Sequence, residues 1–393
     1  MRSTIKVLPS MSGKMGRIQL NNQQAFHALN IEMIHAIQDI LSSFSKSSLK
    51  GIILTASPHP KSKIFCAGGD VKSVYLAGMG LNDNPNDLNA FRLKQHGYGI
   101  SGLSTADFFR EEYRMNYTIA NLPEKQPLIS IWDGIVFGGG VGISILGKYR
   151  ICTENTLFAM PETGIGLFPD VGSTFVLNQL KGSIGLFLAL SGTRLKSEDL
   201  IYSGLATHFV PAEQMEELIQ DLTIASTREG MSSQNWIDEV LIRHHVDIPT
   251  DGCYLAQHQN QIDESFGGKL TMEDIVSSLK AKHDDAFSRE TLQTIEKMSP
   301  TSLKVTLEGM IRGQEYRDIG ESLKMEYRMS QNFMKEGSDF YEGIRATLID
   351  KDKSPKWFPA SLEEVNKDDV IKYFDHLGDN ELTLEPIIDQ SKL

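Results

Sequence analysis

The stretch FAMPETGIGLFPDVG, residues 158 to 172, is the most informative part of this chain. It places two carboxylates, Glu162 and Asp170, within a run that is otherwise apolar and rich in glycine. A carboxylate held among apolar neighbours has a raised pKa, which suits proton transfer near neutral pH. Each residue also has a plain structural explanation, Glu162 in a first helical turn after Pro161 and Asp170 as a loop acid. Taken singly, the structural explanations carry more weight, so the functional interpretation rests on the motifs that accompany them.

Two glycine-rich segments precede this stretch, FCAGGD at 65–70 and VFGGGVG at 136–142. Each ends an apolar run with small residues, whose backbone N–H groups can approach a ligand closely. A tight turn also explains the first segment, and close packing of a strand on a helix also explains the second. Two backbone donors beside a carboxylate are what acyl chemistry on a thioester requires, because the donors hold the oxyanion while the carboxylate handles water or a proton.

Glu112 is a third candidate, on a helix predicted over residues 105–120. Helical spacing places it on an apolar stripe with Phe108, Met115 and Ile119. The neighbouring Glu111 falls on another face, which predicts that Glu111 faces solvent. A buried carboxylate without partners is costly, so Glu112 is expected to point into the cavity of Glu162. An ion pair within the helix is the alternative.

Composition sets broad limits on the class of protein. The chain has 393 residues, 40% of them hydrophobic and 23% charged, which is typical of a globular protein of two or three domains. The net charge of −12, without a basic patch, argues against nucleic-acid binding. No apolar run is long enough for a transmembrane helix, so no membrane partner is expected. A negatively charged small ligand stays possible, because a local basic rim can coexist with an acidic whole.

Cysteine and histidine usage predicts a reducing compartment and no metal site. The three cysteines, Cys66, Cys152 and Cys253, are widely spaced and unpaired by motif, and the ten histidines lack ligand spacing. The segment before the first acidic residue, Glu32, is basic, as in organelle transit peptides. Because residues 1–21 also carry the pattern of a hairpin, a cytoplasmic location is favoured, with the mitochondrial matrix as the alternative for a eukaryotic source.

The hydrophobic pattern along the chain predicts an α/β fold. Apolar runs at 51–57 and 127–134 indicate buried strands, and a helix is expected over 28–44. Residues 71–104 are rich in Gly, Asn, Asp and Ser, which predicts a long surface loop with weak helical pieces. Helical periodicity dominates 212–345, and the tail after 350 is polar.

Together these motifs resemble the crotonase (enoyl-CoA hydratase/isomerase) superfamily, and within it a branch of acyl-CoA thioester hydrolases. The stretches that carry the resemblance also include FFREEY at 108–113, SGLATHFVP at 203–211, MSPTSLK at 298–304, MEYRMSQ at 325–331 and EGIRATLIDKDKSPKW at 342–357. The resemblance implies a spiral core of repeated β-β-α units over residues 1–210 with the active site. A helical C-terminal region over 211–350 would complete the CoA site, followed by a polar tail over 351–393.

The resemblance also implies roles for individual residues. The N–H groups of Gly69 and Gly139 would hold the thioester oxygen, and Glu162 would either activate water or attack the carbonyl to give a mixed anhydride. Asp170 would tune Glu162 or bind the substrate hydroxyl, and Glu112 would line the acyl pocket. The substrate-contacting positions are thus Glu112, Gly139, Glu162 and Asp170. No metal and no cofactor is implied, because coenzyme A arrives as part of the acyl-CoA substrate. A homo-oligomer is possible, since the superfamily forms trimers and hexamers.

Gly142 bears on the class of reaction that the resemblance implies. Hydratases of the superfamily carry a second catalytic glutamate three residues after the middle glycine, where this chain has Gly142. This difference disfavours hydration, and the resemblance implies hydrolysis of a short hydroxyacyl-CoA thioester, with 3-hydroxyisobutyryl-CoA of valine breakdown as the expected substrate. Hydration or isomerisation of an enoyl-CoA is one alternative, and a non-catalytic CoA-binding scaffold is another.

Overall fold

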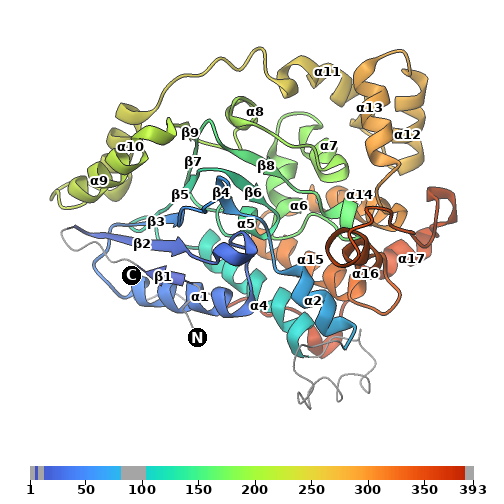
Figure 1. The fold of residues 1–393 in the computed structure, drawn as a ribbon, viewed down its shortest axis with the longest axis horizontal. Coiled ribbons are helices and arrows are strands. Elements are labelled where there is room, and N and C mark those ends of the chain that lie inside the picture. Colours follow the sequence, from blue (N-terminus) through green and yellow to red (C-terminus); the bar gives the residue numbers. More distant parts are fainter. Residues whose placement is uncertain (1–4, 8–12, 81–102, 386–393) are drawn as a thin grey trace.

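A computed structural model describes residues 5–7, 13–80 and 103–385 of the chain (Figure 1). Within them, a six-stranded sheet has the order β1-β2-β3-β5-β7-β9. Its strands are β1 (Ile5–Val7), β2 (Met15–Leu20), β3 (Gly51–Ala56), β5 (Leu128–Trp132), β7 (Tyr149–Cys152) and β9 (His208–Phe209). β1 and β2 pair antiparallel, which confirms the predicted N-terminal hairpin, and every later neighbour pairs parallel.

A smaller parallel sheet of three strands determines where the site lies. It has the order β4-β6-β8, from Ile64–Cys66, Ile135–Phe137 and Leu157–Ala159. Each of its strands directly follows a strand of the larger sheet and leads into a helix or helical turn. The chain therefore repeats a β-β-α unit, and the predicted α/β crotonase-like spiral core is confirmed.

The helices that cover the core begin where the sequence provides a cap. α1 (Ile31–Ser45) starts three residues later than the helix predicted from 28, because the side chain of Asn30 accepts a hydrogen bond from the Met33 N–H at 2.9 Å. α4 (Leu103–Ala120) contains the helix predicted over 105–120. The segment predicted over 71–104 as a loop with helical pieces begins with one such piece, α2 (Val71–Gly78), which Asp70 caps. Residues 81–102 of that loop lie outside the described residues.

The chain after the core is mainly helical, as predicted. The remaining described helices within residues 1–210 are α5 (Gly139–Gly142), α6 (Ser173–Val176), α7 (Ile184–Ser191) and α8 (Ser197–Ser203). The helices after residue 210 are α9 (Met215–Ala225), α10 (Ser233–His244), α11 (Tyr254–Phe266), α12 (Met272–Ala281), α13 (Ala286–Ile295), α14 (Pro300–Gly313), α15 (Ile319–Phe333), α16 (Asp339–Ile344) and α17 (Lys367–Lys372). Figure 1 shows α9 and α10 at one end of the molecule and α11 to α13 at the other. α15 contacts α4 and α6, and α16 contacts α2, so the C-terminal helices flank the small sheet.

One buried cluster of apolar side chains runs through the molecule from Ile18 to Leu382. It crosses the predicted divisions at residues 210 and 350, which stay predictions. The polar tail contributes buried anchors to this cluster at Val365, Val370 and Phe374. Among the described helices, none combines the length and the apolar composition needed to cross a bilayer.

Candidate active site

The three motifs meet at one edge of the small sheet. β4 ends at Cys66, β6 at Phe137 and β8 at Ala159, and each is followed at once by one of the motifs. Because the strands are parallel, their carboxyl ends lie together. Between them is a cavity of about 90 Å³, which α4 closes on one side. All the predicted site residues line it: Gly69, Glu112, Gly139, Glu162 and Asp170.

Two of the residues that line this cavity have backbone N–H groups without a partner. In the described part of the chain, the N–H groups of Gly69 and Gly139 donate no hydrogen bond. A Cβ added at Gly139 would lie 3.0 Å from the Gly69 nitrogen, so the two residues are close neighbours. Gly68 has φ +116° and Gly138 has φ +45°, values that favour glycine. The arrangement has the form of an oxyanion hole, with free donors converging on one small space.

Glu112, Glu162 and Asp170 bring three carboxyl groups to the same cavity, with exposed fractions of 2%, 6% and 5%. The hydroxyl of Tyr113 donates a hydrogen bond to Oδ2 of Asp170 at 2.8 Å. In the described part of the chain, Oε1 of Glu112 and Oε2 of Glu162 are buried without any hydrogen-bond partner. An unpartnered buried oxygen is costly, which indicates that these two atoms serve a ligand.

Burial shifts all three carboxyl groups toward their protonated forms, and repulsion adds to the shift at Glu112 and Glu162. Burial raises the pKa of Asp170 to about 7. Burial, and then the Asp170 charge, raise the pKa of Glu162 well above its usual range. The pKa of Glu112 is raised well above its usual range by burial, then by Asp170 and Glu162. Because like charges this close cannot all ionise, the cluster retains protons near neutral pH and can both accept and donate them.

The Glu162 side chain lies directly beside the glycine run. It begins a 3₁₀ turn, Glu162–Ile165, after Pro161, so the expected first-turn position and the expected cavity position are both correct. A Cβ at Gly138 would lie 2.7 Å from Oε1 of Glu162. Only glycine at position 138 therefore allows this approach.

Asp170 precedes a strained turn. Val171 has φ +56°, which is rare for a β-branched residue and persists only where the surroundings enforce it. A Cβ at Gly142 would lie 2.5 Å from Cβ of Val171. Position 142 thus has no room for the glutamate that hydratases carry there.

Glu111 does not line the cavity, as predicted, but it is not freely solvated. Its carboxylate pairs with Arg114 at 2.8 Å, and its side chain is only 21% exposed. The ion pair that was an alternative for Glu112 is therefore made by its neighbour.

Sequence reasoning missed two residues of the site. Tyr113 lies inside the FFREEY motif, where a hydroxyl beside two glutamates was a usable signal. Glu326, in the MEYRMSQ motif, accepts hydrogen bonds from the N–H groups of Gly172 and Thr174. It is distant in sequence from the residues that it holds, so periodicity and motif spacing could not connect them.

Comparison with known proteins identifies the family. Residues 15–374 match the enoyl-CoA hydratase/isomerase family. The chain is 40% identical to 3-hydroxyisobutyryl-CoA hydrolase, mitochondrial, of Danio rerio, over 96% of this chain and 92% of that protein. It is 39% identical to the Homo sapiens protein of the same name, over 96% of this chain and 90% of that protein.

Two solved structures share the fold over nearly the whole chain. One is a carnitinyl-CoA dehydratase from Mycobacterium thermoresistibile, 33% identical, with a TM-score of 0.82 over 98% of this chain and 99% of that one. The other is an enoyl-CoA hydratase from Rhodobacter sphaeroides, 32% identical, with a TM-score of 0.80 over 97% of this chain and 100% of that one. The match over residues 15–374 and these relatives show that the chain belongs to the enoyl-CoA hydratase/isomerase family, with 3-hydroxyisobutyryl-CoA hydrolases among its relatives.

Proposed function

We propose that this protein hydrolyses 3-hydroxyisobutyryl-CoA to 3-hydroxyisobutyrate and coenzyme A, a step of valine breakdown. The observation that carries the proposal is the convergence of two free backbone donors, at Gly69 and Gly139, with the buried carboxyl of Glu162 on one cavity. The relatives named as 3-hydroxyisobutyryl-CoA hydrolases support the choice of substrate.

The chemistry follows from where these groups lie. The thioester oxygen accepts hydrogen bonds from Gly69 and Gly139, which polarise the carbonyl and stabilise the tetrahedral oxyanion. On one route, the Glu162 carboxylate takes a proton from the attacking water, and the CoA thiolate leaves and is protonated. On the other, Glu162 attacks the carbonyl carbon, the thiolate leaves, and water then hydrolyses the mixed anhydride. Both routes use the same donors and the same carboxylate.

Asp170 and Glu112 have supporting roles in this proposal. Tyr113 fixes one oxygen of Asp170. Burial, and then repulsion from Asp170, raise the pKa of Glu162, which makes its carboxylate a stronger proton acceptor. The unpartnered Oε1 of Glu112 faces the cavity. Burial, then the Asp170 and Glu162 charges, raise the pKa of Glu112 well above its usual range, which favours the protonated carboxyl, a form that can donate a hydrogen bond to the substrate hydroxyl.

Enoyl-CoA hydration is the second candidate, because the two solved relatives are named for dehydration and hydration. Hydration in this superfamily uses a second carboxylate at the position of Gly142. Here Val171 fills that space, since a Cβ at position 142 would lie 2.5 Å from its Cβ. The geometry therefore favours hydrolysis.

Two features of the biological setting extend the proposal. The curated relatives are named as mitochondrial proteins, which supports the matrix alternative over the cytoplasm for a eukaryotic source. A homo-oligomer stays a prediction, testable by light scattering of the purified protein.

A thiol-release assay over a panel of short acyl-CoA thioesters tests the proposed function. We expect rapid CoA release from 3-hydroxyisobutyryl-CoA, and slower release from isobutyryl-CoA because it lacks the hydroxyl. Binding of acyl-CoA without any thiol release would instead support the non-catalytic scaffold. Equal rates for the two substrates would contradict the role given to Glu112.

A further inference from the structure

The helix α15 contributes a fully buried carboxylate that contacts the turn after Asp170 and does not line the cavity. Glu326 is 0% exposed. Its Oε2 accepts a hydrogen bond from the N–H of Gly172 at 2.6 Å. Its Oε1 accepts from the N–H and the hydroxyl of Thr174, at 2.9 and 2.6 Å, and from the hydroxyl of Ser322 at 3.3 Å. Thr174 and Ser322 also contact each other through their hydroxyls.

The position specifically requires a carboxylate. Both oxygens of Glu326 meet backbone N–H groups, which can only donate. A glutamine would turn one of its own N–H groups toward a donor, whichever way the amide is placed. Burial raises the pKa of Glu326 to about 7, although the donors from Thr174 and Gly172 oppose that rise. Burying a carboxylate this completely is costly, so a hydrophobic residue would serve packing alone better.

The groups that Glu326 holds belong to the turn that carries Asp170. Val171 is strained at φ +56°, and Gly172 follows with φ +89°. The carbonyl oxygen of Asp170 accepts a hydrogen bond from the Ser173 N–H at 3.0 Å, which closes the turn on itself. The two bonds from Gly172 and Thr174 to Glu326 tie the turn to α15.

We propose that Glu326 is a positioning residue for Asp170. By fixing the strained turn between them, it aims the Asp170 carboxyl at Tyr113 and the cavity. This inference rests on the proposed function only for its kinetic readout. The carboxylate itself touches no substrate, because it does not line the cavity.

The test compares Glu326→Gln with Glu321→Gln, a matched change at an exposed position of the same helix. In the Glu326→Gln enzyme kcat for thioester hydrolysis falls at least ~10-fold, since small misplacements of catalytic groups have effects of this size or larger. KM changes less than about twofold, because the CoA contacts are untouched. Glu321→Gln leaves both constants unchanged, and Glu326→Asp, which restores the carboxylate, recovers part of kcat.

A double mutant separates positioning from general destabilisation. If Glu326 acts through Asp170, adding Glu326→Gln to Asp170→Asn costs no further activity, whereas independent effects would multiply. A folded Glu326→Gln enzyme that keeps more than half of its kcat, or a fully multiplicative double mutant, would overturn the inference.

Two further measurements cover the remaining outcomes. If Glu326→Gln does not fold, Thr174→Val removes one hydroxyl donor at constant shape, and an unchanged kcat in that variant overturns the proposal. If the unmodified protein releases no CoA, the proposed function fails on its own. In that case the crystal structure of Glu326→Gln tests the positioning role, or that of Thr174→Val if Glu326→Gln does not fold. A Tyr113–Asp170 hydrogen bond retained at its full length would contradict the positioning role.

Discussion

The carboxyls of Glu112, Glu162 and Asp170 share one small cavity, where the Asp170 charge raises the pKa of both glutamates and the Glu162 charge raises that of Glu112. This coupling is a means of keeping a proton acceptor and a proton donor side by side at neutral pH. The Tyr113 hydroxyl donates a hydrogen bond to Asp170, so one Asp170 oxygen already has a partner within the protein. One oxygen of Glu112 and one of Glu162 have no such partner and are available to a substrate.

Replacing Glu162 tests its catalytic role. Glu162→Gln keeps the shape but removes the basic oxygen, so kcat falls at least ~100-fold, within the usual range for general-base assistance. KM changes little, because CoA supplies most of the binding. Steady-state kinetics of thiol release measure both. A variant that keeps more than half of the activity would falsify the assignment.

Isotope labelling separates the two routes for Glu162. A single turnover in H₂¹⁸O leaves label on the Glu162 carboxyl if a mixed anhydride forms and water attacks its protein-side carbonyl. Mass spectrometry of the peptide that contains residue 162 detects it. Unlabelled peptide would reject attack at the protein-side carbonyl and leave general-base hydrolysis, or an anhydride that water opens at its substrate-side carbonyl.

Burying the ionised Asp170 carboxylate lowers the stability of the folded protein, and this loss depends on pH. Its pKa rises from 3.8 to about 7 on folding, so the folded protein retains this proton where the unfolded chain has lost it. Stability is therefore lost as pH rises through that window, by at most about 4 kcal/mol. Asp170→Asn removes the penalty and raises Tm relative to the unmodified protein at about pH 8, but not at about pH 4.

The control for this comparison is Asp375→Asn, at an exposed site. Scanning calorimetry at both pH values measures the difference for each variant. A Tm shift for Asp170→Asn that is the same at both pH values, or that is matched by the control, would show that burial of Asp170 does not strain the fold.

At the scale of elements, the C-terminal helices hold both catalytic turns. The Thr163 carbonyl oxygen, in the Glu162 turn, accepts a hydrogen bond from the N–H of Ser299 at 3.2 Å. α16 lies against the same turn, where a Cβ on Gly343 would be 2.2 Å from the carbonyl oxygen of Ile165. Glu326 in turn holds the residues that follow Asp170. These contacts give a structural role to three C-terminal motifs that do not line the cavity: MSPTSLK, MEYRMSQ and EGIRATLIDKDKSPKW.

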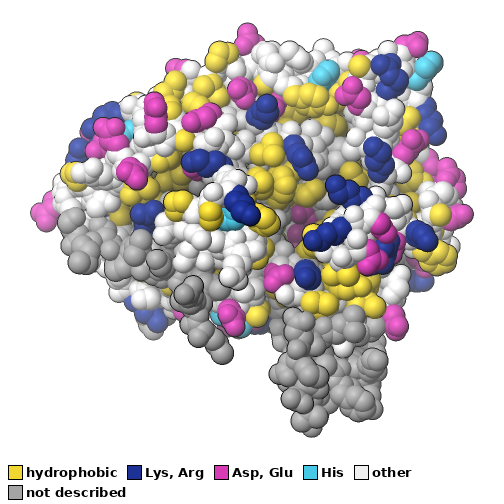
Figure 2. All heavy atoms as spheres, in the orientation of Figure 1, with side chains coloured by type: hydrophobic (Ala, Val, Ile, Leu, Met, Phe, Trp, Pro, Cys, Tyr) yellow, Lys and Arg dark blue, Asp and Glu magenta, His cyan; other side chains and the backbone are white. Residues whose placement is uncertain are grey.

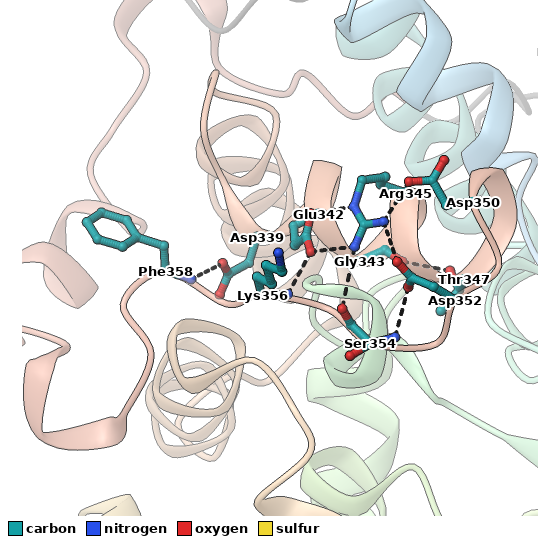
Figure 3. A network of polar contacts seen from close by, with 10 residues as sticks. All are labelled: Asp339, Glu342, Gly343, Arg345, Thr347, Asp350, Asp352, Ser354, Lys356 and Phe358. Carbon is teal, nitrogen blue, oxygen red and sulfur yellow. Dashed lines mark hydrogen bonds and ion pairs between the residues drawn. The ribbon is translucent and has the colours of Figure 1, made fainter.

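The segment after α16 is in turn fastened to that helix by Arg345. Figure 3 shows its guanidinium among Glu342, Asp350 and Asp352, to which it donates at 2.8, 2.6 and 2.7 Å. Asp339, the first residue of α16, accepts a hydrogen bond from the Phe358 N–H at 2.9 Å (Figure 3). The EGIRATLIDKDKSPKW motif therefore folds back on α16 and fixes the helix that supports the Glu162 turn.

A methyl group at Gly343 tests this support. Gly343→Ala forces α16 away from the backbone of Ile165, because the clash is with main-chain atoms. We expect the free energy of unfolding to fall by about 1–3 kcal/mol, as at other overpacked sites, which lowers Tm. We expect kcat to fall as well, because the Glu162 turn moves. Gly252→Ala is the control, since nothing lies within 4 Å of its added Cβ. Equal behaviour of the two variants would show that α16 does not constrain the turn.

Much of the site could be predicted from the sequence, because local signals converge on it. Glu112 was found from helical spacing, and the glycine motifs were found because each follows an apolar run that proved to be a parallel strand. The helix at 71–78 could be predicted only as one of several weak helical pieces, because the residues after it are polar. The strain at Val171 and the contacts of Glu326 and Ser299 depend on packing between distant segments, which no local pattern encodes.

At the scale of the whole molecule, charge is distributed unevenly. The chain carries a net charge of −12, yet Figure 2 shows Lys and Arg side chains gathered around an apolar region in the middle of one face. A basic surround of this kind attracts anionic ligands even on an acidic protein. It suits the phosphates of an acyl-CoA.

Salt dependence tests this attraction. KM for the acyl-CoA rises with ionic strength, because salt screens exposed charges beyond a Debye length of about 10 Å at 0.1 M. The matching acyl-pantetheine, which lacks the phosphates, serves as the control and shows no such rise. Identical salt profiles for the two substrates would show that the basic side chains do not guide the substrate.

The central claim is that this member of the family hydrolyses a thioester and does not hydrate a double bond. The most direct test measures both reactions on one preparation, as CoA release from 3-hydroxyisobutyryl-CoA and as loss of enoyl absorbance from crotonyl-CoA. The account predicts CoA release that depends on Glu162, with negligible hydration. Substantial hydration of crotonyl-CoA, without CoA release from the hydroxyacyl thioester, would contradict it.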